Sequence, residues 1–134
     1  MKIQDSINNS SCTIYTGTQG KKPLIARFLS FLREIRLDPP AFTKNKETIK
    51  KAYQGYKEIN LQALKMIKEG GYLLTFSCSQ HMTPSLFLEM LNDAVIDSKR
   101  SVQMVDYRIQ SIDHPSRLES IEQLYLKCVV LRVK

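Results

Sequence analysis

The chain of 134 residues contains no tryptophan, five glycines, five prolines and three cysteines. Cys12, Cys78 and Cys128 are odd in number and widely spaced, which fits neither a disulfide framework nor a zinc site, so we expect free thiols. No apolar run approaches the roughly 20 residues of a membrane-spanning helix, and the amino terminus lacks the apolar segment of a signal peptide. These absences predict a cytoplasmic protein with no membrane partner.

Positive charge is confined to one part of the sequence. Twelve Lys or Arg and four acidic residues lie between Lys21 and Lys68, whereas the rest of the chain has eight and nine, so this segment carries the whole basic excess of the net +7. A localised basic patch attracts a phosphate backbone, although the solvated face of a helix has a similar composition. Contact with RNA and simple solubilisation of a helix both remain open.

The amino-terminal quarter has little regular patterning. Residues 1–22 are rich in Ser, Asn, Thr, Gly and Lys and are expected to be irregular. Apolar residues at helical spacing after Pro23 then predict a short amphipathic helix that ends near Arg36. The helix should end there because Asp38-Pro39-Pro40 follows, and a residue before proline is pushed away from helical geometry.

A long helix is the most regular feature of the sequence. Its expected cap is Asn45, and Gly70-Gly71 should supply its left-handed end. Between them, apolar residues recur at helical spacing over six turns, at Ile49, Ala52, Tyr53, Tyr56, Ile59, Ala63, Leu64 and Ile67.

The remaining elements alternate between strand and helix. Tyr72–Phe76 is short and almost wholly apolar, which predicts a strand buried on both faces. Thr83 should cap a second helix that opens with Pro84, and strands are expected at Val102–Tyr107 and Leu124–Val133, the latter inside the sheet. The order predicts an α/β fold with parallel strands and an antiparallel terminal strand.

Cys78 is the candidate nucleophile. It lies in the polar turn Ser77-Cys78-Ser79 at the end of a predicted buried strand, where open α/β sheets hold their ligands. In isolation, such a cysteine is more often an inert buried thiol. His81 lies close in sequence, but a surface histidine is a better interpretation than a Cys/His pair.

Five short motifs resemble one known family. They are Asp38-Pro39-Pro40-Ala41-Phe42, residues 55–60 (GYKEIN), Gly70-Gly71 with Phe76-Ser77-Cys78-Ser79, Asp113-His114-Pro115, and Tyr125-Leu126-Lys127. In this order and spacing they resemble the carboxyl-terminal half of class I S-adenosylmethionine-dependent methyltransferases that act on carbon 5 of cytosine in large-subunit ribosomal RNA and carry an amino-terminal PUA domain. The resemblance implies a partial Rossmann-like methyltransferase sheet, S-adenosylmethionine as cofactor and ribosomal RNA as partner.

The resemblance also implies roles for particular residues. Cys78 would be the thiolate that adds to carbon 6 of cytosine. Asp38 would hydrogen-bond the base edge, the backbone at Pro39 and Pro40 would hold its exocyclic amine, and Phe42 would support the extruded base. A related guanine-modifying group has asparagine at the position of Cys78, which favours cytosine as the target.

The chain also departs from this family. Residues 1–36 contain neither the glycine-rich cofactor turn nor the acidic residue of a second strand, the PUA domain has no counterpart, and the strand expected before Asp38 looks skipped. We therefore interpret residues 1–36 as an atypical leader with a short helix, and residues 37–134 as the carboxyl-terminal half of a catalytic domain. The expected function is that of a truncated methyltransferase, inactive alone because the cofactor-binding half is absent. The alternative is an inactive basic remnant that binds RNA or self-associates through an open sheet edge.

Overall fold

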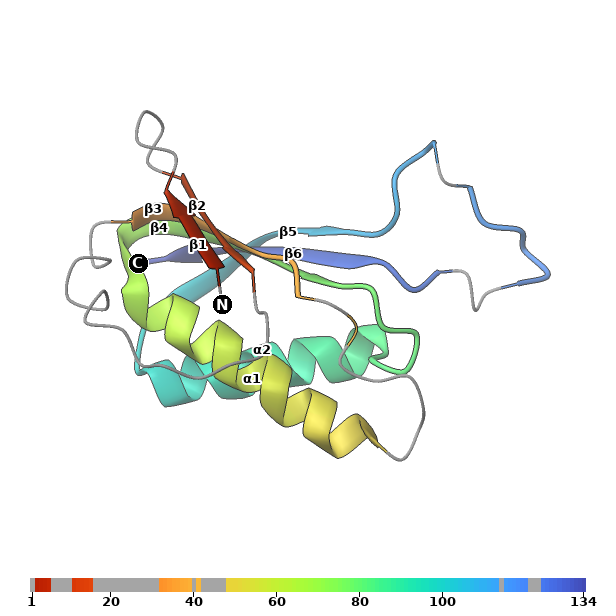
Figure 1. Ribbon diagram of the computed structural model, residues 1–134, viewed down its shortest axis with the longest axis horizontal. Helices are drawn as coiled ribbons and strands as arrows, with labels where there is room; N and C mark the ends of the chain where they lie inside the picture. The colour runs from red at the N-terminus through yellow and green to blue at the C-terminus, as the bar shows by residue number, and fades with distance from the viewer. Residues whose placement is uncertain are drawn as a thin grey trace.

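The computed structural model describes residues 2–5, 11–15, 32–39, 41, 48–113, 115–120 and 124–134 (Figure 1). In these residues one six-stranded sheet has the strand order β1-β2-β3-β4-β6-β5. The elements are β1 (Lys2–Asp5), β2 (Ser11–Tyr15), β3 (Leu32–Leu37), α1 (Ile49–Met66), β4 (Ile67–Ser77), α2 (Pro84–Ser98), β5 (Val102–Arg108) and β6 (Lys127–Val133).

The strand directions confirm the predicted α/β class. β2, β3 and β4 are parallel neighbours, and β6 pairs antiparallel with both β4 and β5. The terminal strand is therefore antiparallel and interior, as predicted, although it begins at Lys127 and not at Leu124. A further antiparallel pair, β1 with β2, was not predicted.

The predicted helix ending near Arg36 is wrong in its last residues, because Leu32–Leu37 forms β3. Ile35 and Leu37 are fully buried while Arg36 is exposed, which is the alternation of a strand with one face toward the core. Pairing with β2 on one side and β4 on the other outweighs the local helical spacing. Consequently Asp38 does follow a strand, and no strand is skipped before it.

Residues 1–22 are also more regular than predicted, since they contain β1 and β2. The upstream part of the predicted helix, residues 24–31, lies outside the described residues.

The long helix α1 is confirmed, but both of its predicted ends move. Asn45 lies outside the described residues, and the N-cap is Thr48. The helix ends at Met66, where Ile67 turns directly into the extended backbone of β4. Gly70 does have a positive φ of 79°, yet it lies within β4, where the register with β3 shifts between Leu32 and Glu34. The two glycines thus form a strand irregularity and not a helix stop.

The second helix begins as predicted. The hydroxyl of Thr83 accepts a hydrogen bond from the Leu86 amide at 3.2 Å, and Pro84 occupies the first turn. The helix ends at Ser98, followed by Lys99 in the left-handed region. Within the described residues, neither helix combines the length and the apolar character needed to cross a membrane.

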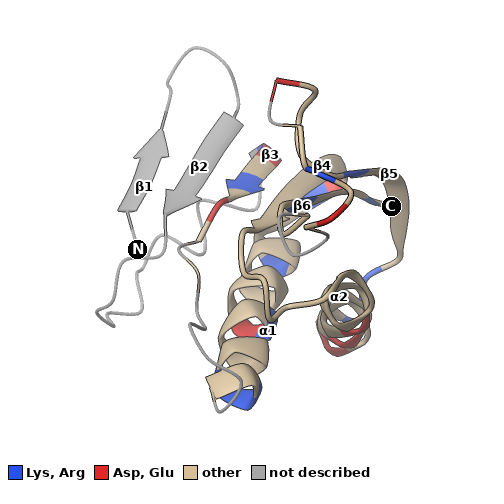
Figure 2. Cartoon of the chain, turned by 90° about the vertical axis from the view of Figure 1, so that its right-hand side faces the viewer, with Lys and Arg blue, Asp and Glu red and all other residues tan. Residues whose placement is uncertain are grey.

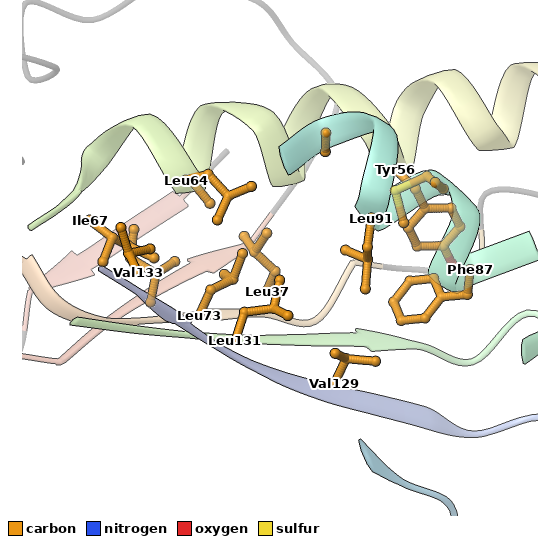
Figure 3. Packing of buried hydrophobic residues seen from close by; sticks show 14 of the residues in the cluster. Leu37, Tyr56, Leu64, Ile67, Leu73, Phe87, Leu91, Val129, Leu131 and Val133 are labelled. Atoms are coloured by element: carbon orange, nitrogen blue, oxygen red, sulfur yellow. The ribbon is translucent and has the colours of Figure 1, made fainter. Parts of the chain in front are cut away.

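The core lies between the sheet and the two helices, which both cover the same face (Figures 1 and 3). Labelled in Figure 3 are the buried side chains Leu37, Tyr56, Leu64, Ile67, Leu73, Phe87, Leu91, Val129, Leu131 and Val133. In β4, Leu73 and Thr75 face this core and are fully buried, whereas Tyr72 is 37% exposed. The prediction that this strand is buried on both faces is therefore wrong, because neither described helix covers its outer face.

We expect Gly71→Ala to destabilise the fold. A Cβ atom at this position would lie 2.6 Å from Cγ2 of Ile67 and 2.8 Å from the backbone oxygen of Arg33, and the latter belongs to the neighbouring strand and cannot swing away. The free energy of unfolding should fall by about 1–3 kcal/mol, as measured by urea denaturation. The matched control is Gly70→Asn, where open space and asparagine's tolerance of positive φ should limit the loss to less than about 1 kcal/mol. Equal losses at the two glycines would contradict the described register.

Candidate active site

Two parallel strand ends bring Asp38 and Cys78 to one edge of the sheet. Leu37 in β3 is opposite Thr75 in β4, so Asp38 follows this pair by one residue and Cys78 by three. Asp38 is exposed and Cys78 is partly buried. The carboxylate and the thiol therefore lie at the carboxyl ends of adjacent strands, where open α/β sheets hold ligands.

The turn that carries Cys78 is hydrogen-bonded to a residue of α1 on the core side of the sheet. The Ser77 hydroxyl donates to the phenol oxygen of Tyr56 at 3.2 Å and accepts from the Ser79 amide at 3.4 Å. Tyr56 is fully buried, with its ring edge-on to Phe87 at a centroid distance of 6.1 Å. The phenol that packs in the core thus also fixes the residue before Cys78. The buried ring agrees with the place of Tyr56 in the apolar stripe of the long helix, and its hydroxyl adds a contact to the turn.

Lys127 holds the other side of the same turn. It lies opposite Ser77 at the start of β6, is only 3% exposed, and donates from Nζ to the Ser79 carbonyl at 2.9 Å and the Tyr125 carbonyl at 2.7 Å. Burial lowers the pKa of Lys127 to about 8, and its electrostatic interaction with Cys78 opposes this decrease. In the described part of the chain, no carboxylate forms an ion pair with this ammonium group.

The other predicted site residues are placed less completely. Pro39 is buried directly after Asp38, whereas Pro40 and Phe42 lie outside the described residues. His81 is partly buried in the turn after Cys78, and no hydrogen bond between these two side chains is found in the described part of the chain.

The cysteines differ in their surroundings. Cys78 and Cys128 are free thiols, as predicted, and the side chain of Cys12 is outside the described residues. Cys128 is partly exposed on the outer face of the sheet, opposite Phe76 and Arg108. Burial raises the pKa of Cys128, and Arg108 opposes the increase.

Sequence reasoning missed the position of Lys127. It was noted only as the last residue of the motif Tyr125-Leu126-Lys127, although a signal was present. Counting in twos from Lys127 reaches three buried residues, Val129, Leu131 and Val133, so the lysine shares the core face of β6. A lysine in register with the buried face of an interior strand indicates a polar partner inside the protein.

The described residues do not form a complete site for S-adenosylmethionine. Around Asp38 and Cys78 they offer one carboxylate and one thiol, without the glycine-rich turn or the additional acidic residue that would hold a nucleoside cofactor. A cavity of about 170 Å³ is lined by residues of α2, β5 and β6, including Leu88, Val95 and Met104, and neither Asp38 nor Cys78 contributes to it. Pockets that bind small-molecule ligands usually have volumes of about 300 Å³ or more, so this cavity is smaller than a typical ligand pocket.

The basic segment is partly neutralised within the fold. The Lys57 ammonium of α1 pairs with Asp97 of α2 at 2.7 Å, and the Tyr53 hydroxyl donates to Asp93 at 2.5 Å. Figure 2 shows basic residues on α1 and acidic residues on α2. Burial and this hydrogen bond raise the pKa of Tyr53 to about 12. Lys50, Lys51 and Lys65 on α1 stay exposed, so the contact of this helix with RNA remains a prediction.

We expect Lys127 to make stability rise with pH above 8. Its pKa is about 8 in the folded chain and 10.5 in the absence of burial, so between these values the unfolded state keeps a proton that the folded state has lost. The free energy of unfolding should therefore gain about 1–2 kcal/mol from this group between pH 8 and 9.5. Urea denaturation at both pH values, with Lys127→Met as the comparison, measures the increment. A difference between the two proteins that does not change with pH would refute it.

Comparison with known proteins gives a partial match in sequence. No family model matches the chain. Over 99 residues, 74% of its length, the chain is 46% identical to ribosomal RNA large subunit methyltransferase I of Escherichia coli O1:K1, and the same values hold for the protein of that name from Shigella boydii serotype 18. The matched region is 25% of either relative, so the chain spans about a quarter of the length of these proteins.

Solved structures establish the fold. The candidate methyltransferase SMU.776, solved in complex with SAH, superposes with a TM-score of 0.62 and 23% identity over 75% of this chain and 26% of its own. A candidate SAM-dependent methyltransferase from Streptococcus mutans gives a TM-score of 0.61 and 21% identity over 75% and 25% of the two chains. The predicted Rossmann-like methyltransferase sheet is thereby confirmed. In sequence, the chain is similar to a stretch that makes up a quarter of the length of ribosomal RNA large subunit methyltransferase I.

Proposed function

We propose that this chain supplies the nucleophile and the base-binding edge of an S-adenosylmethionine-dependent methyltransferase that acts on carbon 5 of cytosine in large-subunit ribosomal RNA. The observation that carries the proposal is the position of Cys78, beside the strand end that bears Asp38, in a turn fixed by Tyr56 and Lys127. The 46% identity to proteins named for rRNA methylation supports the substrate class.

The chemistry of cytosine accounts for the thiol. Carbon 5 is a poor nucleophile until another group adds to carbon 6. In the proposed reaction, the Cys78 thiolate forms a bond to carbon 6, and the ring electrons displaced to carbon 5 allow that carbon to take a methyl group. S-adenosylmethionine, when bound, would supply this group as an electrophile: its sulfur–methyl bond would break, and the sulfur would keep the electron pair and leave as a neutral thioether. Loss of the proton on carbon 5 then expels Cys78 as a thiolate and restores the aromatic ring.

The base would be held at the edge of the sheet by groups next to the thiol. Asp38 is exposed directly after β3 and is proposed to hydrogen-bond the base edge, while the carbonyl oxygens of Pro39 and Pro40 accept from the exocyclic amine. Phe42 would pack against the extruded base.

The methyl donor requires groups that the described residues do not provide. Because the chain spans about a quarter of its relatives, we propose that the donor is held by a portion corresponding to the rest of those proteins. The chain by itself would then have little or no methyltransferase activity.

A second candidate function is RNA binding without chemistry. The exposed lysines on α1, Lys50, Lys51 and Lys65, favour it. Such binding would weaken steeply with salt and would not depend on Cys78.

The proposed chemistry can be tested in a chimaera. The 99 matched residues of the E. coli relative are replaced by those of this chain, and transfer of labelled methyl groups from S-adenosylmethionine to large-subunit rRNA is measured. Cys78→Ala should reduce transfer by at least about a thousandfold, because the adduct cannot form, and Cys128→Ala should leave it within about twofold.

Binding of the methyl donor by the chimaera, measured by calorimetry, serves as the folding control. Equal transfer by the Cys78→Ala chimaera and its parent would rule out the nucleophile. Salt-sensitive RNA binding by a chimaera that binds the donor but transfers nothing would support the second function.

Titration of the isolated chain with S-adenosylmethionine tests the requirement for a further portion. We expect no heat of binding up to about millimolar donor, because the described residues lack the cofactor-binding groups. Micromolar affinity would overturn the proposal that the donor is held elsewhere. Circular dichroism of the same sample checks that the isolated chain is folded.

A further inference from the structure

Lys127 carries a buried positive charge, and among the described residues no negatively charged side chain offsets the free-energy cost of removing that charge from water. The side chain is 3% exposed, and its ammonium group contacts two carbonyl oxygens but no carboxylate among the described residues. An ammonium group can donate three hydrogen bonds, and burying one without a counter-charge is costly. Apolar side chains fill the other inward positions of β6, so packing alone does not explain a lysine here.

The carbonyl that Lys127 binds belongs to the turn of the candidate nucleophile. Nζ lies 2.9 Å from the oxygen of Ser79, the residue after Cys78, while the residue before it, Ser77, is bonded to Tyr56. Two contacts from different elements therefore hold the residues on both sides of Cys78, one through the Ser77 side chain and one through the Ser79 carbonyl. The same ammonium group interacts electrostatically with the thiol.

The other charged groups nearby are arranged differently. Asp38 follows β3 in an exposed position, and His81 lies in the turn after Cys78. Arg108 and Asp106 pair with each other at 2.6 Å on β5, beside Cys128 on the outer face. Among the described residues, Lys127 is thus the buried cation on the core face beneath the turn.

We propose that Lys127 is a positioning residue for Cys78: it holds the turn through the Ser79 carbonyl and places a positive charge beneath that turn. The inference deepens the proposed function and rests on Cys78 as the nucleophile. A role in folding alone would make Lys127 matter for stability but not for the reactivity of Cys78.

The distinguishing experiment is site-resolved alkylation of the full chain with iodoacetamide at pH 7.5, followed by mass spectrometry. We expect Lys127→Met to slow alkylation of Cys78 by about tenfold, since the substitution releases the turn from its hydrogen bond and removes the positive charge beneath it. Lys127→Arg, which keeps the charge, should stay within about threefold of the original rate. Cys128, on the other face of the sheet, is the internal reference and should change less than about twofold in either variant. An unchanged Cys78 rate in Lys127→Met, or equal slowing of both cysteines, would overturn the proposal.

A measurement on the unsubstituted chain covers the case in which Lys127→Met does not fold. A nearby cation should accelerate the anionic reagent iodoacetate relative to neutral iodoacetamide. We expect the ratio of the two rates at Cys78 to exceed that of a synthetic peptide of residues 76–80 by about threefold or more, because the peptide has the same neighbours in sequence but lacks Lys127. Equal ratios would overturn the electrostatic part of the proposal.

The proposed function and the role of Lys127 can be refuted independently of each other. Alkylation needs neither RNA nor a methyl donor, so a Lys127-dependent rate can be found even if the Cys78→Ala chimaera still transfers methyl groups, and that combination would refute only the proposed function. In an active chimaera, Lys127→Met should lower kcat and leave the KM for RNA unchanged, because Lys127 acts through Cys78 and not on the RNA. A raised KM with unchanged kcat would place Lys127 outside the chemistry.

Discussion

The pairing of β4 on both of its edges is the constraint on which the described structure depends. β3 fixes it in parallel, and β6 fixes it in antiparallel. With both edges occupied, the strand cannot slip by a residue without turning Leu73 and Thr75 away from the helices, which would expose the centre of the core. The same register places Cys78 just past the strand end. The position of the thiol is thus a consequence of a strand that is paired on both of its edges.

Buried hydrogen bonds connect the end of β4 to α1. Asn60 is fully buried and donates from Nδ2 to the Tyr56 carbonyl at 2.8 Å, while the Tyr56 hydroxyl reaches Ser77. Buried polar groups stabilise little on balance, but they permit few alternative arrangements, because each unmade hydrogen bond costs about 1–3 kcal/mol. The turn around Cys78 is a loop, but its hydrogen bonds to α1 and β6 restrict its conformation.

The elements that the sequence predicted well are those whose local signals agree with their tertiary surroundings. Thr83-Pro84 starts α2 because cap and proline act within one turn, and the strand before Cys78 follows from its apolar run. β3 was misread because apolar residues upstream of Arg36 fit a helix, and only its pairing with two distant strands decides otherwise. Gly70 was rightly expected to adopt a positive φ, but the sequence did not show that a strand irregularity would require it.

The candidate site also contains residues that local sequence could identify and one residue, Lys127, that it could not. Cys78 was found because it follows a strand of recognisable sequence, whereas Asp38 was identified only through the motif Asp38-Pro39-Pro40. The parallel register then brings the two strand ends together. Lys127 depends on which face of β6 is buried and on what lies opposite it, and both are properties of the assembled sheet. Local sequence therefore identified the reactive groups, whereas the group that supports them became visible only through non-local pairing.

The hydrogen bond between Lys127 and Ser79 joins residues 48 positions apart, and this separation has a consequence for synthesis. Ribosomes add roughly 5–20 residues per second, so the turn is made roughly 2–10 seconds before the lysine that holds it. Throughout that interval the cysteine has neither the fixed backbone nor the charged neighbour of the folded chain. Because β6 is translated last, Cys78 acquires its folded surroundings only after Lys127 has been made and β6 has paired with β4.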